Sequence, residues 1–415
     1  MLAEFIGFVT RHEGKKFLKL SEETDQSMIT AAGLQGDKEA SLYIHIPFCK
    51  TLCPFCCFNR YLFKEDRVRE YFKHLKRELA LYIQRGFKFS DFYFGGGTPT
   101  VLMDELNGFI DYLNENFEVK RISLETTPQE INPETVASLK AVGINRLSIG
   151  VQSFDNDILK NIGRPFYPGE EIKKRLLMAE GEFDTLNVDF VFNFPGQSIE
   201  QFEADVADFK NLGIDQATFY PLMASPHKKN ALERRFNRID TSQEKKFYDV
   251  ILRELYADGY KASTVWCFSK GDRMIDEYIV DFDDYIGIGA GSVSIVKGNF
   301  YVNSFSLDRY GEFLNNDKLP VVGWRTLSEG EHLRYYLLTK LFGMKVDKRK
   351  FYQRFNADIQ EKLRKELLFF RLFGLVQGEE EISVTPKGMY PVSVMMREFF
   401  ASLNSLREYG IEKQI

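Results

Sequence analysis

The sequence predicts an α/β protein, an open partial (β/α)6 barrel of parallel strands followed by a C-terminal helical, winged-helix-like domain. From residue 41 onward, mostly apolar segments of strand length alternate about six times with segments of helical periodicity. Strands that are apolar on both faces and separated by helices are typical of a parallel sheet that is covered on both faces. After about residue 225 the alternation ends, and the end of the chain has a helical pattern.

Six strands are predicted, each an apolar run between turn-forming segments. They cover residues 41–46, 89–94, 121–126, 146–151, 185–194 and 216–222. Helices are predicted from apolar residues at a spacing of three to four, at 64–86, 103–117, 132–143, 199–213 and 241–260. Asn132 is the expected N-cap of the third of these helices. Residues 283–296 are expected to form a further strand that is interrupted by glycines.

Both ends of the chain are expected to lie outside the barrel. The first residues contain two possible short helices and a polar linker at 33–40, and they form the predicted N-terminal extension, 1–40. The barrel is assigned to 41–305. A helix at 327–343, followed by a helix, a short hairpin and a helix within 368–403, assigns 306–415 to the winged-helix-like domain.

Composition and charge exclude several classes of protein. The net charge is −5, whereas a nucleic-acid-binding face is basic, so no nucleic-acid partner is expected. No run of about 18 apolar residues occurs, so no membrane span is expected. The first residues do not have the apolar core of a secretory signal. Five cysteines in 415 residues are too few for a disulfide framework, which favours a reducing, cytoplasmic location.

Four of the five cysteines lie in one stretch, PFCKTLCPFCCFN. Cys49, Cys53 and Cys56 have the spacing C-x3-C-x2-C and follow the first predicted strand. A cubane iron–sulfur cluster held entirely by protein needs four thiolates, so three leave one iron open. The alternatives are a zinc knuckle or metal-free thiols in a core, but zinc sites usually have two C-x2-C pairs and no second pair is present. Cys57 is left over, as a spare thiol or a fourth ligand.

These motifs resemble those of the radical S-adenosylmethionine (SAM) superfamily, which has C-x3-C-x2-C after a first strand. YIHIPFC more narrowly resembles the oxygen-independent coproporphyrinogen III oxidase group. That group includes haem chaperones, anaerobic haem-degrading enzymes and radical methyltransferases. Seven further blocks occur in the family order: YFGGGTPT, ISLET, RLSIGVQSF, GRPF, VDFVFNFPGQS, GIGAGSVS and VTPKG.

The resemblance implies a [4Fe-4S] cluster that is bound by Cys49, Cys53 and Cys56, with SAM on its open iron. An electron from the reduced cluster splits the sulfonium of SAM, and the 5′-deoxyadenosyl radical then takes a hydrogen atom from the substrate. The cofactor carries the difficult chemistry, while the protein positions the reactants and excludes water. An electron donor such as flavodoxin or ferredoxin is implied as a partner.

A glycine-rich turn, GGGTPT, ends the second predicted strand. Glycine permits positive φ and close backbone approach, so the amides of this turn can meet the carboxylate of SAM; a tight strand-to-helix turn is the alternative. The resemblance places Gly96, Gly97 and Thr98 in contact with SAM. Further cofactor-binding residues that it implies are Tyr43, Phe55, Glu125, Gln152, Arg164, Asp189 and Val293. The alternatives for these are core packing, a helix-start acid at Glu125 and a surface salt bridge at Arg164.

Some members of the group bind a second SAM molecule, so one SAM or two are expected. Gln152, Arg164 and Asp189 match positions assigned to this second molecule in the oxidase. Directly after the tyrosine of the sixth strand the family has a small residue, and this chain has Pro221 there. This departure counts against an unchanged second SAM pocket.

The cysteine loop fits neither subgroup cleanly. The oxidase pattern has a cysteine at the place of Phe58, and the haem-chaperone pattern has an aspartate at the place of Cys57. The later family block is replaced by WCFS at 266–269, which we interpret as lining of the substrate pocket, with an apolar strand as the alternative. Cys57 is the predicted catalytic residue, because a thiol near the radical could donate a hydrogen atom; inert packing is the alternative.

The predicted function is a radical SAM enzyme that cleaves SAM reductively and acts on a tetrapyrrole-like substrate. The reaction is either oxidative decarboxylation of coproporphyrinogen or radical methyl transfer to a haem or porphyrin, and the tetrapyrrole is implied by the resemblance alone. A haem-binding chaperone is the alternative from another class. A methyltransferase or cyclopropane-forming enzyme acting on a natural product is the alternative among enzymes.

Overall fold

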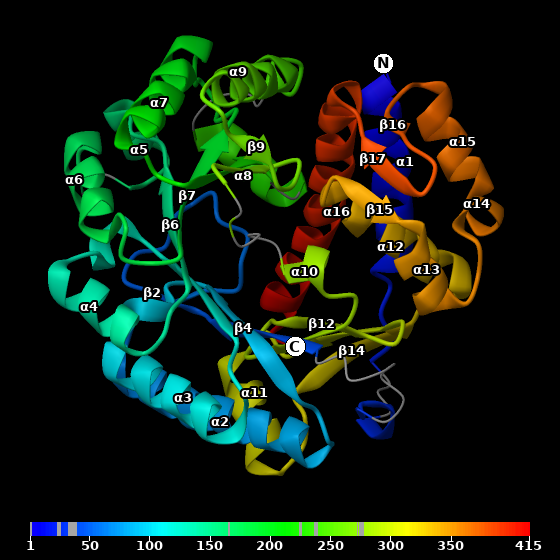
Figure 1. The fold of residues 1–415 in the computed structure, drawn as a ribbon. Coiled ribbons are helices and arrows are strands. Elements are labelled where there is room, and N and C mark those ends of the chain that lie inside the picture. The colour runs from blue at the N-terminus through cyan, green and yellow to red at the C-terminus, as the bar shows by residue number, and fades with distance from the viewer. Residues whose placement is uncertain are drawn as a thin grey trace.

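A mostly parallel β-sheet forms the centre of the protein in the computed structural model, with helices along its outer side (Figure 1). The structure describes residues 2–22, 26–31, 40–164, 167–223, 226–235, 240–271, 273 and 278–415. The predicted α/β fold class with a partial barrel of parallel strands and a C-terminal helical region is confirmed.

The six predicted strands are confirmed, and they pair in parallel in chain order, which is the connectivity of repeated β/α units. They are β1 (Ala40–Ile46), β4 (Phe89–Gly96), β5 (Arg121–Thr126), β6 (Arg146–Gln152), β7 (Thr185–Phe192) and β8 (Gln216–Pro221). Nearly all of their residues are buried, as expected for strands that are covered on both faces.

Helices return the chain between these strands and lie around the outside of the sheet in Figure 1. They are α2 (Glu65–Gln84), α3 (Met103–Asn116), α4 (Pro133–Ala141), α5 (Asn156–Asn161), α6 (Gly169–Ala179) and α7 (Ile199–Leu212). The sequence predicts all of them except α5 and α6. Asn132 caps α4 as predicted, because its side-chain oxygen accepts a hydrogen bond from the Thr135 amide at 3.0 Å.

The sheet continues beyond the six strands on both sides, in the order β14-β13-β12-β11-β1-β4-β5-β6-β7-β8-β10-β9. The added strands are β9 (Lys261–Ala262), β10 (Cys267–Ser269), β11 (Tyr285–Ile288), β12 (Val293–Val296), β13 (Asn299–Asn303) and β14 (Val321–Thr326). The strand expected over 283–296 is two antiparallel strands, β11 and β12. Gly289 and Gly291, with φ of +99° and +80°, turn the chain back between them.

The C-terminal region has the element order of a winged helix. Its elements are α12 (Glu329–Phe342), β15 (Lys345–Asp347), α13 (Lys348–Phe355), α14 (Ile359–Lys362), α15 (Arg364–Leu372), β16 (Val376–Gln377), β17 (Glu381–Val384) and α16 (Pro386–Lys413). Strands β15, β17 and β16 form a small antiparallel sheet. The remaining helices lie between strands of the large sheet: α8 (Pro226–Arg235), α9 (Glu244–Ala257), α10 (Tyr278–Asp281) and α11 (Leu307–Asn315).

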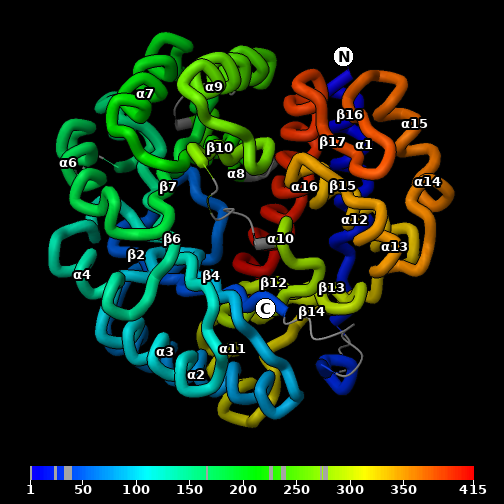
Figure 2. Tube along the Cα trace, in the orientation of Figure 1, coloured from blue at the N-terminus to red at the C-terminus, as the bar shows by residue number. Residues whose placement is uncertain are grey.

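The N-terminal helix packs along the C-terminal one, as Figure 2 shows by the blue and red tubes. The two short helices expected here are wrong: the described residues form one helix, α1 (Leu2–Phe17), and a 3₁₀ turn, and most of the expected linker lies outside the described residues. A Cβ at Gly14 would lie 2.9 Å from the Ser402 hydroxyl, so glycine permits the close contact of α1 with α16. This contact with a segment that is distant in sequence stabilises α1, whose helical conformation the local sequence does not determine.

One hydrophobic core runs from the barrel into the C-terminal region. It includes Leu42 of β1, Phe17 of α1 and Phe399 of α16. The division of the chain into 1–40, 41–305 and 306–415 therefore stays a prediction. Among the described helices, none combines the length and the apolar character that a membrane crossing requires.

Candidate functional site

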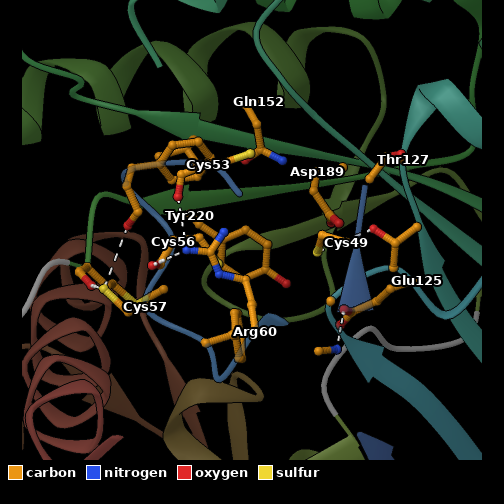
Figure 3. Close-up of a pocket in the computed structure, with 18 of the residues that line it drawn as sticks. Cys49, Cys53, Cys56, Cys57, Arg60, Glu125, Thr127, Gln152, Asp189 and Tyr220 are labelled. Atoms are coloured by element: carbon orange, nitrogen blue, oxygen red, sulfur yellow. Dashed lines mark hydrogen bonds between the residues drawn. The ribbon is translucent and has the colours of Figure 1, made fainter. Parts of the chain in front are cut away.

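A cavity opens at the carboxyl ends of the parallel strands, where α/β folds place their sites. Its volume of about 350 Å³ lies in the range of small-molecule sites. Every residue that the sequence proposes for the site lines this cavity: Tyr43, Cys49, Cys53, Phe55, Cys56, Cys57, Gly96, Gly97, Thr98, Glu125, Gln152, Arg164, Asp189 and Val293. Figure 3 shows how several of them face a common space. The structure brings these residues together, and their individual roles stay predictions.

The cysteine loop follows β1, and its conformation is fixed by paired strands at its base and by hydrogen bonds to its central carbonyl groups. Cys49 and Cys53 are buried free thiols, and Cys56 is a half-buried one. Nη2 of Arg60, a residue that the sequence does not single out, donates to the carbonyl oxygens of Cys53 at 3.0 Å and Cys56 at 3.1 Å. The base consists of two short paired strands, β2 (Phe48–Cys49) and β3 (Tyr61–Leu62).

The thiols of this loop do not converge on one point. In the part of the chain that the structure describes, no three histidine, cysteine, aspartate or glutamate side chains are placed to share one metal ion. A zinc knuckle requires such convergence on a tetrahedral ion. In a cubane each cysteine binds a different iron, so the thiols are spread around the cluster. The described geometry therefore does not support a zinc knuckle, and the cluster-binding role of Cys49, Cys53 and Cys56 stays a prediction.

Hydrogen-bond donors point at two of the three sulfurs. Burial raises the pKa of the Cys49 thiol to about 11, although the Thr98 hydroxyl, 3.6 Å from its Sγ, opposes this shift. Nε of Arg164 donates to Sγ of Cys53 at 3.3 Å. Cys49 is therefore protonated at neutral pH in the metal-free protein, and binding of iron would release this proton. Donors to sulfur would stabilise thiolates at these two positions.

The glycine turn after β4 packs directly against the cysteine loop. Gly96 has φ of +107°, and a Cβ there would lie 2.5 Å from the His45 ring. A Cβ at Gly97 would lie 2.6 Å from the Phe48 carbonyl oxygen. The amides of Gly97 and Thr98 donate to backbone carbonyls of the cysteine-loop segment at 2.8 Å rather than into the cavity. The predicted close approach is present, but the backbone that comes close is the protein's own.

Glu125 extends from the end of β5 into the cavity (Figure 3). Its Oε1 accepts a hydrogen bond from the Tyr93 hydroxyl at 2.8 Å, and its Oε2 accepts one from the Gly96 amide at 3.2 Å. Tyr93 itself lines the cavity and stacks on Tyr43, with ring centroids 6.0 Å apart. Tyr93 is absent from the sequence predictions, although its place two residues before the glycine turn is a signal that could have identified it.

Tyr43 and His45 belong to a buried series of hydrogen bonds beneath the glycine turn. The Asn59 carbonyl can only accept, so Nε2 of His45 carries the proton and donates to it at 3.0 Å, while the Tyr43 hydroxyl donates to Nδ1 at 2.9 Å. Burial lowers the pKa of His45 to about 4, which keeps the imidazole neutral. With both ring nitrogens engaged, His45 supports the turn and is not placed as a metal ligand.

Gln152, Arg164 and Asp189 meet at the ends of β6 and β7. Gln152 adopts φ of +76° at an irregularity in the pairing of these strands, and such a conformation is unusual for a non-glycine residue. Asp189 accepts hydrogen bonds from the Ser148 hydroxyl at 2.9 Å and from Nδ2 of Asn187 at 2.7 Å. The surface salt bridge that was the alternative for Arg164 is absent from the described residues, since its guanidinium donates to Cys53 and to the Gly150 carbonyl.

Cys57 and Cys49 lie at opposite sides of the space drawn in Figure 3. Its Sγ makes weak hydrogen bonds, each 3.7 Å long, to the carbonyl oxygens of Phe55 and of Met223 in the segment after β8. Phe55 packs edge-on against Phe194. Cys57 thus contacts the segment after the sixth strand, where Pro221 also lines the cavity. Its catalytic role stays a prediction.

The turn between β11 and β12 carries Val293 to the cavity, and a buried carboxylate of α2 holds this turn in place. Glu78 accepts hydrogen bonds from the Gly289 amide at 2.8 Å, from Nδ2 of Asn303 at 2.6 Å and from the Tyr310 hydroxyl at 2.5 Å. Burial raises the pKa of Glu78 to about 7, although these three hydrogen bonds oppose the shift.

Glu78→Gln is expected to remove part of the pH dependence of stability. A carboxyl whose pKa is raised on folding stabilises the protein fully only below its unfolded pKa, and this contribution is lost as the pH rises through the folded value of about 7. Between pH 5 and pH 8 the wild type should therefore lose up to about 3 kcal/mol more unfolding free energy than the variant. Urea unfolding at both pH values measures this difference. Glu70→Gln, on the exposed side of the same helix, is the matched control, and equal pH dependence of wild type and Glu78→Gln would contradict the assignment.

The C-terminal helix closes one side of the cavity, which the sequence does not predict. Residues from α12, α16 and the segment before β10 contribute an aromatic and apolar wall with one cation: Trp266, Tyr335, Phe399, Phe400, Leu403, Asn404 and Arg407. Trp266 is fully buried, and its indole nitrogen donates to Ser393 of α16 at 2.8 Å. The interpretation of residues 266–269 as pocket lining thus agrees with the position of Trp266, while Cys267–Ser269 form the strand β10.

Comparisons with known proteins agree with this fold. A family model described as the radical SAM superfamily matches residues 43–209. The haem chaperone HemW of Bacillus subtilis (strain 168) is 26% identical over 82% of this chain and 93% of its own length. The oxygen-independent coproporphyrinogen III oxidase of Helicobacter pylori (strain ATCC 700392 / 26695) is 27% identical over 89% of this chain and 88% of its own length. In fold, the chain is similar to the coproporphyrinogen III oxidase HemN of Escherichia coli, with a TM-score of 0.78 and 23% identity over 92% of this chain and 95% of that one.

Proposed function

We propose that this protein is an enzyme that uses radical chemistry on a tetrapyrrole. The premise is that the chain belongs to the radical SAM superfamily and, within it, to the coproporphyrinogen III oxidase-like group. Its superfamily implies two cofactors, a [4Fe-4S] cluster and SAM. When bound, they supply one-electron cleavage of the SAM sulfonium and a radical that abstracts hydrogen. The single observation that supports this proposal is the common cavity in which the cysteine loop, the glycine turn and an aromatic wall meet.

The residues present suit this pair of cofactors. Cys49, Cys53 and Cys56 would hold the cluster, since they are free thiols that line the cavity. The turn that contains Gly96 has no side chain facing the loop, and the carboxylate of Glu125 stands beside it. A carboxylate at this position can accept from an ammonium or a hydroxyl group of SAM. Tyr43, Val293 and the other aliphatic and aromatic residues of the wall would exclude water from the reacting atoms.

The aromatic wall favours a large, flat and apolar substrate, as aromatic side chains do in small-molecule sites. Of the two reactions that the group offers, oxidative decarboxylation removes a hydrogen atom, carbon dioxide and one electron from a propionate side chain, and it requires an electron acceptor. Radical methyl transfer instead adds a methyl group to the ring. We propose decarboxylation first, because coproporphyrinogen III oxidases are among the relatives that match along most of the chain.

A haem chaperone is the second candidate function. The relative HemW carries that description and matches over 93% of its own length. The difference lies in the fate of the ligand, because a chaperone holds haem unchanged whereas an enzyme alters its substrate and consumes SAM. We further propose a reductant of the flavodoxin or ferredoxin type, and a cytoplasmic location in which the five free cysteines stay reduced.

Anaerobic incubation of the reconstituted protein with SAM, a reductant and either coproporphyrinogen or haem distinguishes these functions. Mass spectrometry of the products is the measurement. Loss of mass from coproporphyrinogen together with formation of 5′-deoxyadenosine supports decarboxylation, and a gain of a methyl group supports methyl transfer. Haem that is bound stoichiometrically and recovered unchanged supports the chaperone. SAM cleavage with neither tetrapyrrole bound nor changed would contradict a tetrapyrrole function.

A further inference from the structure

Arg407 is a cation of the cavity wall that has no carboxylate partner within the described residues. Arg407 of α16 is half-buried and lines the cavity. Its Nη1 donates to Oδ1 of Asn404 at 2.9 Å, and its guanidinium lies over the Phe58 ring, 4.6 Å from the centroid. Neither contact neutralises the charge or occupies Nε and Nη2. A guanidinium has five N–H donors in a planar fork, so most of its binding capacity is unused here.

The other cations of the cavity are already occupied. Nζ of Lys50 forms an ion pair with Glu130 at 2.9 Å. Arg60 is held by two backbone carbonyls of the cysteine loop, and Arg164 by the Cys53 sulfur and the Gly150 carbonyl. Arg60 and Arg164 also have no carboxylate partner among the described residues, and Nε of Arg60 makes no hydrogen bond, but both hold the cysteine-loop side of the cavity. Arg407 is the cation that the aromatic wall itself offers to an anion.

The position of Arg407 is set by contacts on both sides. Nδ2 of Asn404, one turn earlier on α16, donates to the Met223 carbonyl at 2.8 Å, and the same carbonyl accepts from Cys57 at 3.7 Å. Arg407 therefore lies where the C-terminal helix, the segment after β8 and the cysteine loop meet. Burial is the main cause of the lowered pKa of His45, and the charge of Arg407 adds to it.

We propose that Arg407 binds a carboxylate of the substrate and so selects a carboxylate-bearing macrocycle over an uncharged one. This inference rests on the proposed tetrapyrrole function and names the group of the substrate that is recognised. The planar fork can bind a carboxylate through two parallel hydrogen bonds, while the neighbouring aromatic wall takes the apolar ring. The Phe58 ring keeps the guanidinium plane oriented and partly desolvated, which strengthens such a pair.

Binding titrations with coproporphyrin III and with its tetramethyl ester test this proposal. The wild type should bind the free acid more tightly than the ester. Arg407→Gln should weaken binding of the acid by about 10- to 100-fold, because a hydrogen-bonded charged partner is lost, and should leave binding of the ester unchanged. The affinity of Arg407→Lys for the acid should fall between those of the wild type and Arg407→Gln, since lysine keeps the charge but not the planar fork of donors. Arg77→Gln is the matched control and should behave as the wild type. It removes an exposed arginine of α2 that is paired with Asp317.

Two results would overturn the assignment while leaving the proposed function intact. One is that the wild type binds porphyrin but Arg407→Gln binds the acid as tightly as the wild type does. The other is an equal loss of affinity for acid and ester, which would make Arg407 a packing residue. A wild type that cleaves SAM but binds neither porphyrin would instead remove the tetrapyrrole from the proposed function, and the carboxylate assignment with it. The ratio of acid to ester affinity separates these cases.

Discussion

Cys53→Ala is expected to contain almost no iron after anaerobic reconstitution, whereas the wild type should take up about four irons per chain. The variant would leave two irons of a cubane without a protein ligand. It would also remove the sulfur to which Arg164 donates, so the loop loses a contact at its centre. Iron and sulfide analysis together with the visible absorption spectrum measures the loss. The same result is expected for Cys49→Ala and Cys56→Ala.

Cys57→Ala is the matched control, because it removes an adjacent thiol whose hydrogen bonds are weak and point to backbone carbonyls. It should keep its iron and its spectrum. A Cys53→Ala protein with full iron content would contradict the ligand set, and loss of iron from Cys57→Ala would show that the set includes the wrong cysteine. Turnover of Cys57→Ser then tests the catalytic prediction, since an altered product indicates participation and an unchanged product and rate indicate packing.

Gly96→Val is expected to reduce formation of 5′-deoxyadenosine at least about 100-fold, the effect of displacing reacting groups by about an ångström. A valine here would have both an unfavourable positive φ and a Cβ 2.5 Å from the buried His45 ring. Because that ring is hydrogen-bonded on both sides, the turn and the cysteine loop would have to move apart. Equilibrium binding of SAM and assay of its cleavage measure the effect.

Gly96→Ala and Gly143→Ala make this result interpretable if the valine variant does not fold. Gly143 also has positive φ, at +84°, but a Cβ there would meet nothing within 4 Å, so its alanine variant carries the backbone strain alone. Gly143→Ala should cleave SAM as the wild type does, and Gly96→Ala should not. If Gly96→Ala binds and cleaves SAM normally, GGGTPT is only a strand-to-helix turn.

Local patterns in the sequence were enough to determine the six parallel strands and most of their helices, and to predict the chemistry of the cysteine loop. Each of these depends on residues that are near one another in the chain. The spacing of Cys49, Cys53 and Cys56, the glycines after β4 and the Asn132 cap are examples. Residues at the ends of parallel strands could also be assigned to one site, because those ends meet at one edge of the sheet. The cavity contains all of them.

The tertiary structure alone decided which distant segment covers that edge. An apolar helix face shows that a helix is buried but not what it is buried against, so nothing local marks α16 as a cavity wall or Arg407 as its cation. The contact of α1 with α16 joins Arg11 to Glu398, 387 residues apart, and it decides that the N-terminal segment is one helix. The partner of Tyr93, Glu125 on the next strand of the sheet, likewise comes from another segment of the chain. These features depend on the final packing of elements far apart in sequence, and no local periodicity or propensity encodes that packing.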